Sequence, residues 1–269
     1  MELERESTVE ESPGGSPHLE RTRAGGSAAG EGLRGAPEAA TPAVLDLSPE
    51  RITYQKLRND PEIIGLIRMA DRYLETIGYT DHGLKHLARV SQRAFRLLLD
   101  LGLPRREAEL AAVAGLLHDI GNLVHRDEHP QSSALMAFTL LKERGMEVEE
   151  IATVVGAIAN HDDSIGEPVS NVSAALIIGD KSDVLRTRVR NPRMISFDIH
   201  DRVNYAAQRS QLTVEPKRHL ITLSLDIDTR ISQVMEYFEI FMVRMRMSRR
   251  AANFLNCDLQ LIINNTQVL

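Results

Sequence analysis

The sequence of 269 residues contains one cysteine, no tryptophan and few aromatic residues of any kind. The single thiol, Cys257, excludes an intramolecular disulfide framework and a zinc site built on several thiolates. Aromatic residues make up 4% of the chain, which disfavours a stacking platform for single-stranded nucleic acid. No apolar run approaches the roughly 18 residues that a membrane-spanning helix needs. We therefore expect no membrane partner.

An excess of positive charge is also missing, because the formal net charge is -6. Proteins that bind duplex nucleic acid carry clustered lysine and arginine, so we predict that no nucleic-acid duplex is a partner. The first six residues have no apolar stretch and do not resemble a secretory signal. With 42% hydrophobic and 26% charged residues, the composition is typical of a globular protein, and we expect it to be cytoplasmic.

Histidine residues are concentrated in one part of the sequence. Histidine is the commonest metal ligand and the main acid-base group near neutral pH. Six of the nine histidines fall within 80 residues, namely His82, His86, His118, His125, His129 and His161. This concentration predicts that the chemistry lies between residue 82 and about residue 183.

Composition divides the chain into three segments. Residues 1–47 are rich in glycine, proline and glutamate without apolar periodicity, which predicts a disordered acidic tail. Residues 48–190 show apolar residues at three- and four-residue spacing, which predicts a mainly α, helical domain. The predicted helices are 53–78, 81–102, 104–120, 130–144, 148–160 and 171–186.

Residues 191–269 have a different texture and predict a small α+β module with ββαβ order. Two alternating, β-branched segments, 210–215 and 219–228, flank the turn at Pro216. A helical period follows from Ile231 over about 25 residues, and residues 259–263 form a third strand. The module contains no ligand cluster, so we interpret it as a packing element or the contact of a homodimer, with ligand sensing as the second interpretation.

Polar residues at the ends of the predicted helices are the candidates for function. His118 and Asp119 follow a nearly continuous apolar helix, where burying them without partners would cost several kcal/mol. A bound metal ion would offset that cost. Asp180 likewise follows an apolar run, and His82 and His86, at positions i and i+4 of the second predicted helix, share a helix face.

Two further histidines stand at helix ends, His129 before the fourth helix and His161 after the fifth. Helical bundles build metal sites from side chains that converge in this way. Imidazole and carboxylate ligands together suit Mn, Fe, Co, Ni or Zn and do not distinguish among them.

The order His86, His118-Asp119, Asp180 resembles the H…HD…D pattern of the HD superfamily of metal-dependent phosphohydrolases. The stretches from Leu116 to Asn122 and from Asp180 to Asp183 resemble the second and last motifs of that family. The resemblance implies an HD-type helical bundle in which His86, His118, Asp119 and Asp180 hold a divalent transition metal. It also implies that His129 and His161 complete a site for a second ion, which Asp119 would bridge.

On this resemblance, the protein is a phosphohydrolase or phosphodiesterase. It would hydrolyse a phosphate ester or anhydride of a nucleotide-like small molecule with a metal-activated hydroxide. The implied partner is a phosphorylated small-molecule substrate. No Gly-Tyr-Pro follows His161, and Asp162 stands where the HD-GYP cyclic dinucleotide phosphodiesterases have a second histidine. These departures argue against that subgroup.

Several weaker candidates have an ordinary structural interpretation as well. Asp119, Lys181 and His82 are the predicted catalytic residues, Lys181 as a partner of substrate phosphate and His82 in substrate binding or proton transfer. Asp183 would orient a neighbour or lie on a solvated face. Four arginines would recruit an anionic substrate or form a solvated face, namely Arg186, Arg188, Arg190 and Arg193. His125 is expected in an exposed loop.

Two alternatives of other classes stay open. The first is a catalytically silent HD domain that binds a nucleotide or metal and signals through the C-terminal module. The second is an interaction protein whose histidines are incidental. Metal analysis separates the second alternative from the others, and a turnover screen separates an enzyme from a silent domain.

Overall fold

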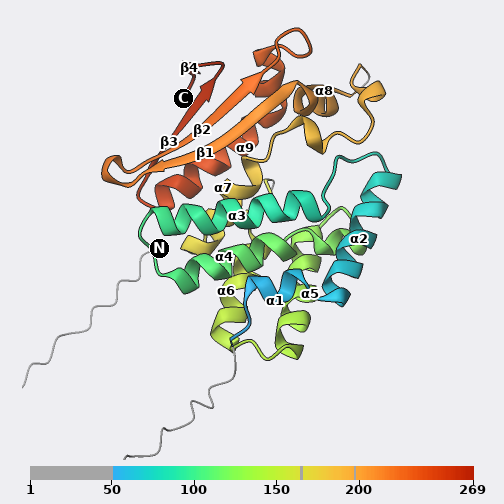
Figure 1. The fold of residues 1–269 in the computed structure, drawn as a ribbon, viewed down its shortest axis with the longest axis vertical. Coiled ribbons are helices and arrows are strands. Elements are labelled where there is room, and N and C mark those ends of the chain that lie inside the picture. Colours follow the sequence, from blue (N-terminus) through green and yellow to red (C-terminus); the bar gives the residue numbers. More distant parts are fainter. Residues whose placement is uncertain (1–50, 164–165, 197) are drawn as a thin grey trace, which may run out of the picture. The chain divides into compact units, whose positions relative to one another are not determined.

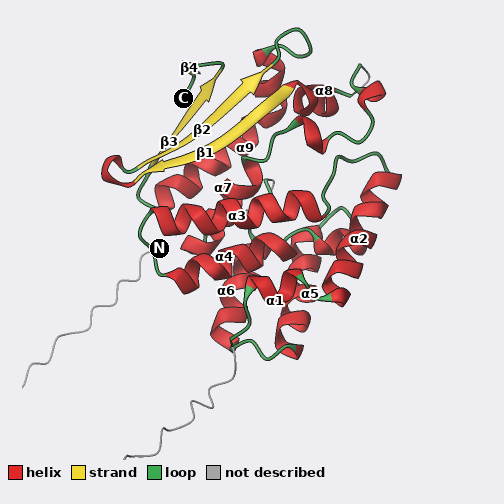
Figure 2. Ribbon diagram, in the orientation of Figure 1, coloured by secondary structure: helices red, strands yellow, loops and turns green. Residues whose placement is uncertain are grey.

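The computed structural model describes residues 51–163, 166–196 and 198–269, which belong to one compact unit. The predicted tail, residues 1–47, lies outside the described residues. A bundle of helices forms one layer, and a small sheet with a long helix against it forms another (Figures 1 and 2). The prediction of a mainly α fold with an α+β module is therefore confirmed. No helix among the described residues has the length and apolarity needed to cross a bilayer.

The bundle consists of helices with buried apolar faces. Their bounds are α1 (Tyr54–Arg58), α2 (Pro61–Thr76), α3 (Leu84–Asp100), α4 (Arg105–Leu117), α5 (His129–Glu143), α6 (Val148–Ala159) and α7 (Asn171–Lys181). Helix α7 is buried along nearly its whole length, and α4 is buried from Leu110 to its end, since small and aliphatic residues occupy these positions. Helix α3 packs against both of them. The carboxyl-terminal ends of these two central helices carry the candidate ligands.

Several predicted helix boundaries are wrong, and α3 begins at Leu84 instead of residue 81. The first predicted helix is interrupted, because the Asp60 side chain accepts hydrogen bonds from the backbone N–H groups of Glu62 and Ile63 and starts a new helix at Pro61. Helix α4 ends three residues early, before a 3₁₀ turn, η1 (Ile120–Leu123). Helix α7 ends at Lys181 instead of residue 186, so Asp180 lies in its last turn.

The C-terminal part contains a short helix, a four-stranded sheet and the longest helix among the described residues. The elements are α8 (Ile199–Ala206), β1 (Ala207–Glu215), β2 (Leu220–Ile227), α9 (Val234–Phe254), β3 (Asp258–Ile263) and β4 (Thr266–Gln267). The strand order is β1-β2-β3-β4, with β1 antiparallel and β3 parallel to β2. Helix α9 is the crossover that parallel pairing requires. The predicted ββαβ order is present, with the two-residue β4 added.

Two apolar clusters make up the core, and α9 contributes to both. The larger cluster fills the bundle and includes Met247 and Ala251 of α9. The smaller cluster lies under the sheet and includes Tyr237, Phe241 and Met245 of the same helix. The sheet and the bundle are therefore joined by one continuous helix.

Candidate metal centre

His118 and Asp119 lie in the turn between α4 and η1, and the local sequence fixes them there. Asn122 donates from its Nδ2 atom to the backbone oxygen of Asp119 at 2.8 Å and to its Oδ1 atom at 3.1 Å. Gly121 allows α5 to approach this turn, since an added Cβ would lie 2.3 Å from the backbone nitrogen of Ser133 and 2.5 Å from the backbone oxygen of His129. This close approach brings His129 beside Asp119.

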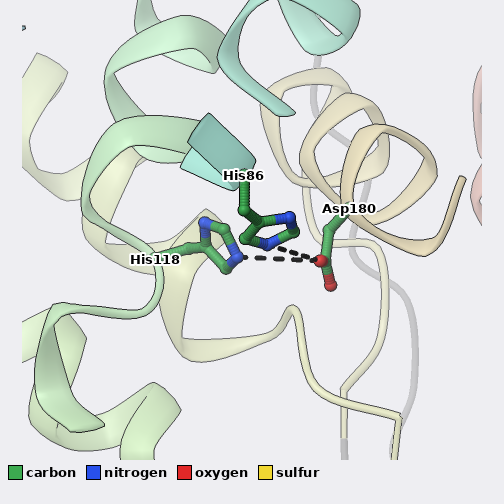
Figure 3. A group of neighbouring side chains, drawn as sticks. All are labelled: His86, His118 and Asp180. Carbon is green, nitrogen blue, oxygen red and sulfur yellow. Dashed lines mark ion pairs between the residues drawn. The ribbon is translucent and has the colours of Figure 1, made fainter. Parts of the chain in front are cut away.

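His86 of α3 and Asp180 of α7 meet His118 on one side of the Asp119 carboxylate. The Nε2 atom of His86 lies 3.3 Å from Oδ1 of Asp180 and 3.7 Å from Oδ2 of Asp119. The Nε2 atom of His118 lies 3.7 Å and 3.3 Å from the same two oxygens. Figure 3 shows both rings directed at Asp180. Three separate helices thus bring their ligand-type atoms to one point.

The other oxygen of Asp119 faces the second pair of histidines. His129 begins α5, and its Nε2 atom lies 3.4 Å from Oδ1 of Asp119. His161 directly follows the C-cap of α6, and its Nε2 atom lies 4.0 Å from the same oxygen. The structure therefore brings all six predicted ligand residues together, with the two oxygens of Asp119 facing different sets.

The hydrogen bonds of the four rings leave each Nε2 atom available. The Nδ1 atoms of His118, His129 and His161 lie 2.6 to 3.0 Å from backbone carbonyl oxygens, which only accept hydrogen bonds. The Nδ1 atom of His86 lies 2.7 Å from Oδ2 of Asp183. With a cation bound, the Nδ1 atoms would carry the proton of the neutral rings, and each Nε2 atom would present a lone pair to the cation. Arg188 also approaches the Nδ1 atom of His86, with its Nη1 atom at 2.8 Å.

This arrangement is unfavourable without a cation. The Nε2 atoms of His86 and His118 are buried and have no hydrogen-bond partner within the described part of the chain. Orphaned buried acceptors cost about 1–3 kcal/mol each. Two overlapping groups, which share His118, have ligand-type atoms close enough to hold an ion: His86, His118 and Asp180, and His118, Asp119 and His161. The residues fit a divalent metal centre.

The electrostatics of the cluster show the same need for positive charge. Burial opposes a charged His118, but the carboxylates of Asp119 and Asp180 outweigh burial and raise its pKa to about 10. Burial also opposes ionised Asp119, yet the neighbouring His118 keeps the Asp119 pKa well below its usual value. Burial and the proximity of His118 lower the pKa of His161 to about 3. The two carboxylates stay ionised, so they are ready to bind a cation.

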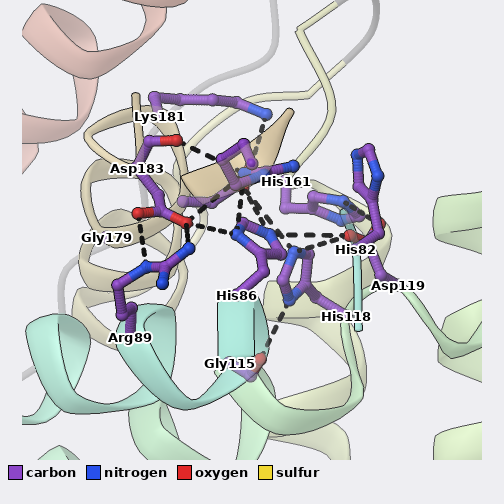
Figure 4. A network of polar contacts seen from close by, with 12 residues as sticks. His82, His86, Arg89, Gly115, His118, Asp119, His161, Gly179, Lys181 and Asp183 are labelled. Atoms are coloured by element: carbon purple, nitrogen blue, oxygen red, sulfur yellow. Dashed lines mark hydrogen bonds and ion pairs between the residues drawn. The ribbon is translucent and has the colours of Figure 1, made fainter. Parts of the chain in front are cut away.

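Asp183 orients His86, and Figure 4 shows Arg89 beside the Asp183 carboxylate. Arg89 donates to both oxygens of Asp183, at 2.8 and 3.1 Å, and Arg188 lies 3.4 Å from one of them. The interpretation of Arg188 as part of a solvated face is wrong, because only 5% of its surface is exposed. A carboxylate behind a ligating histidine fixes its tautomer and ring orientation.

Two of the predicted catalytic residues have surroundings that the sequence did not indicate. Lys181 is buried, with its Nζ atom 2.7 Å from Asp180 and 3.1 Å from Asp163, so carboxylates already hold its charge. His82 does not share a helical face with His86, because α3 begins only at Leu84. Its ring nevertheless contacts the ring of His86, with the centroids 5.6 Å apart.

A cleft of about 430 Å³ lies beside the candidate ligands, since it is lined by His82, whose ring contacts the ring of His86. Its lining comes from the α2–α3 connection, the loop before α5, the turn after α7, and helices α8 and α9. The lining residues are Ile77, Gly78, Tyr79, Thr80, His82, Arg126, Arg188, Asp198, His200, Asp201, Asn204, Phe241 and Arg244. Sequence analysis missed the contribution of α8 and α9, because no motif marks those residues. His125, with a 68% exposed side chain, does not line this cleft.

Comparison with known proteins identifies the family of this part of the chain. The HD domain family matches residues 83–205, which include all six candidate ligands. This part of the chain therefore matches an HD domain. A crystal structure of a predicted HD superfamily hydrolase from an uncultured Thermotogales bacterium is 26% identical, over 46% of this chain and 67% of that one. Its TM-score of 0.38 is too low to carry a structural argument.

Three further proteins are similar in sequence to this chain. An uncharacterized protein of Methanocaldococcus jannaschii is 23% identical over 69% of this chain and 81% of its own length. Ribonuclease Y of Oceanobacillus iheyensis is 26% identical over 64% of this chain and 35% of its own length. Ribonuclease Y of Thermus thermophilus is 38% identical over 37% of this chain and 16% of its own length. The alignments thus span about a third or less of each ribonuclease.

Proposed function

We propose that the protein is a metal-dependent phosphohydrolase or phosphodiesterase that acts on a nucleotide-like substrate. The observation that carries this proposal is the set of four Nε2 lone pairs that face Asp119 and Asp180. His86, His118, Asp119 and Asp180 would hold the first ion. His129 and His161 would hold a second ion through the other oxygen of Asp119.

The side chains around that centre would hold the ions, orient the ligating rings and contact the substrate. A bound divalent ion supplies a Lewis acid for phosphoryl oxygens and lowers the pKa of water. Asp183 would keep the proton on Nδ1 of His86, so that its Nε2 atom stays a ligand. Lys181 would limit the negative charge near Asp180, rather than bind substrate phosphate as the sequence predicted. His82, at the junction of cleft and cluster, would contact the substrate.

The relatives named ribonuclease Y support the choice of phosphodiester bonds among the substrates to be tested. The substrate panel therefore includes p-nitrophenyl phosphate as a monoester, bis(p-nitrophenyl) phosphate as a diester and the dinucleotide ApA. The last two compounds separate phosphodiesterase from phosphomonoesterase activity.

The test uses the full chain, freed of metal and reloaded with Mn²⁺, Fe²⁺, Co²⁺, Ni²⁺ or Zn²⁺ in turn. We expect turnover of at least one substrate with the wild type, and a fall of 100-fold or more with Asp119→Asn. Asp100→Asn, at the exposed end of α3, is the matched control and should retain activity. Metal binding without turnover of any substrate would instead support the silent HD domain, and full activity of Asp119→Asn would refute the proposed centre.

A further inference from the structure

The cleft beside the metal centre is lined by three arginines from three different elements. Arg126 comes from the loop before α5, Arg188 from η2 (Arg186–Arg188) and Arg244 from α9. We propose that they form a subsite for a second phosphate group of the substrate, next to the one that is hydrolysed. This inference rests on the proposed function and narrows its substrate class to nucleotides that carry an additional phosphate.

Each arginine is held in place but keeps donors available. The guanidinium of Arg126 lies over the ring of Tyr79, 5.1 Å from its centroid, and donates to Asn122 from Nη1. The guanidinium of Arg244 lies over Phe241 at 4.8 Å and donates from Nε to Asp163. A guanidinium has five N–H donors, so each retains most of them. Fixed arginines bind phosphate with a smaller loss of side-chain entropy.

Arg188 provides the strongest sign of a ligand. Its side chain is 7% exposed, and its buried Nε atom has no hydrogen-bond partner among the described residues. Its carboxylate neighbour, Asp183, is already bound through both oxygens by Arg89. The charge of Arg188 is therefore only partly compensated, and a phosphate in the cleft would supply the missing acceptor.

The acidic residues of the cleft limit where the phosphate would lie. Asp198 and Asp201 both come from the start of α8, where Asp198 caps the helix through the backbone N–H groups of His200 and Asp201. Burial and the proximity of Asp198 raise the pKa of Asp201, which indicates a site unfavourable to further negative charge. The phosphate would therefore occupy the side lined by the arginines.

This proposal also gives the C-terminal module a role in the reaction. Arg244 is the cleft arginine that belongs to α9, and its partner Asp163 also lies 3.1 Å from Lys181. Arg244 thus connects the module to the surroundings of the metal ligand Asp180. It is a specificity-determining residue, whereas the module was predicted to serve packing or dimerisation.

The experiment compares two substrates that differ by one phosphate, ApA and the 5′-phosphorylated pApA. We expect wild-type kcat/KM for pApA to exceed that for ApA by about 10- to 100-fold, because charge-assisted hydrogen bonds discriminate at that scale. Arg244→Gln should lose most of this preference, because its KM should rise much more for pApA than for ApA. Arg246→Gln, exposed on the same helix and absent from the cleft lining, is the matched control and should keep the preference.

Equal kcat/KM for the two substrates in the wild type, or an unchanged preference in Arg244→Gln, would overturn the subsite and leave the hydrolase proposal intact. A binding measurement keeps the two proposals distinct if no substrate turns over. Calorimetric titration with adenosine 3′,5′-bisphosphate should show at least 10-fold weaker binding to Arg244→Gln than to wild type and Arg246→Gln. Equal affinity in all three proteins would refute the subsite independently of catalysis.

Discussion

Removal of His161 tests whether the centre holds two ions. Its Nε2 atom faces Oδ1 of Asp119, whereas His86 and His118 face Oδ2. His161→Ala should therefore remove a ligand of the second ion and leave the first set intact. We expect the metal content to fall from about two ions to about one per chain.

The expected size of the effect follows from the contacts that His161 makes. The substitution removes one hydrogen bond, from Nδ1 to the backbone oxygen of Ile158, and one buried ring. Its cost to folding should be about 1–3 kcal/mol. Loss of one metal anchor should cost at least about 3 kcal/mol of transition-state stabilisation, which is roughly a 100-fold fall in kcat.

Elemental analysis of purified protein, with the activity assay run in parallel, measures both quantities. His125→Ala is the matched control, because His125 belongs to the same histidine-rich part of the sequence but has an exposed side chain. It should retain the wild-type metal content and activity. One ion per chain in both wild type and His161→Ala would show that the two-ion arrangement is wrong, even with an intact first site.

Three further predictions concern stability and the residues behind the ligands. Removal of metal by a chelator should lower the melting temperature by roughly 5–10 °C, because a ligand at 100 times its Kd stabilises the folded state by about 2.7 kcal/mol. An unchanged melting temperature would contradict a tightly bound ion. Asp183→Asn should weaken metal affinity by about 10- to 100-fold, measured by competition with a chromophoric chelator, and wild-type affinity would show that Asp183 does not tune His86. Burial raises the pKa of Asp183, but hydrogen bonds from His86 and the nearby arginines outweigh burial and hold this pKa far below its usual 3.8. The ionised Asp183 therefore adds to the free energy of unfolding above about pH 5, and this contribution decreases as the pH falls. In metal-free protein, urea unfolding should therefore show the advantage of wild type over Asp183→Asn shrinking as the pH falls from about 5 to about 2. A constant difference would exclude this origin.

The convergence of the six candidate ligands could be predicted from the sequence, because helix ends place polar residues at defined positions. Apolar periodicity located the helices, and the polar residues that follow buried runs, such as His118 and Asp180, could only be explained by partners. The division of Asp119 between two sets of histidines was implied by the resemblance alone. This division depends on the rotamer of the Asp119 side chain and on the close approach of α5 to Gly121. The spacing of residues in the sequence specifies neither.

The cleft could not be predicted, because its residues come from elements distant in sequence. Arg126, Arg188 and Arg244 meet only after α9 packs on α7, and no periodic signal connects them. Arg188 illustrates the difficulty, since a local run of arginines is usually solvated. Its burial results from Asp183, a neighbour that the sequence interpretation left undecided between an orienting role and a solvated position.

Helix α9 contributes side chains to both apolar clusters, so the unfolding of one cluster affects the other. Loss of the sheet would uncover Tyr237 and Phe241, and a frayed α9 would also withdraw Met247 and Ala251 from the bundle. Neither cluster can melt while the other keeps its full apolar contacts. The described part of the chain should therefore denature in one cooperative transition, with equal calorimetric and van't Hoff enthalpies. A chain cut before residue 234 would lack both sets of contacts and would expose the apolar surface of α7 to aggregation.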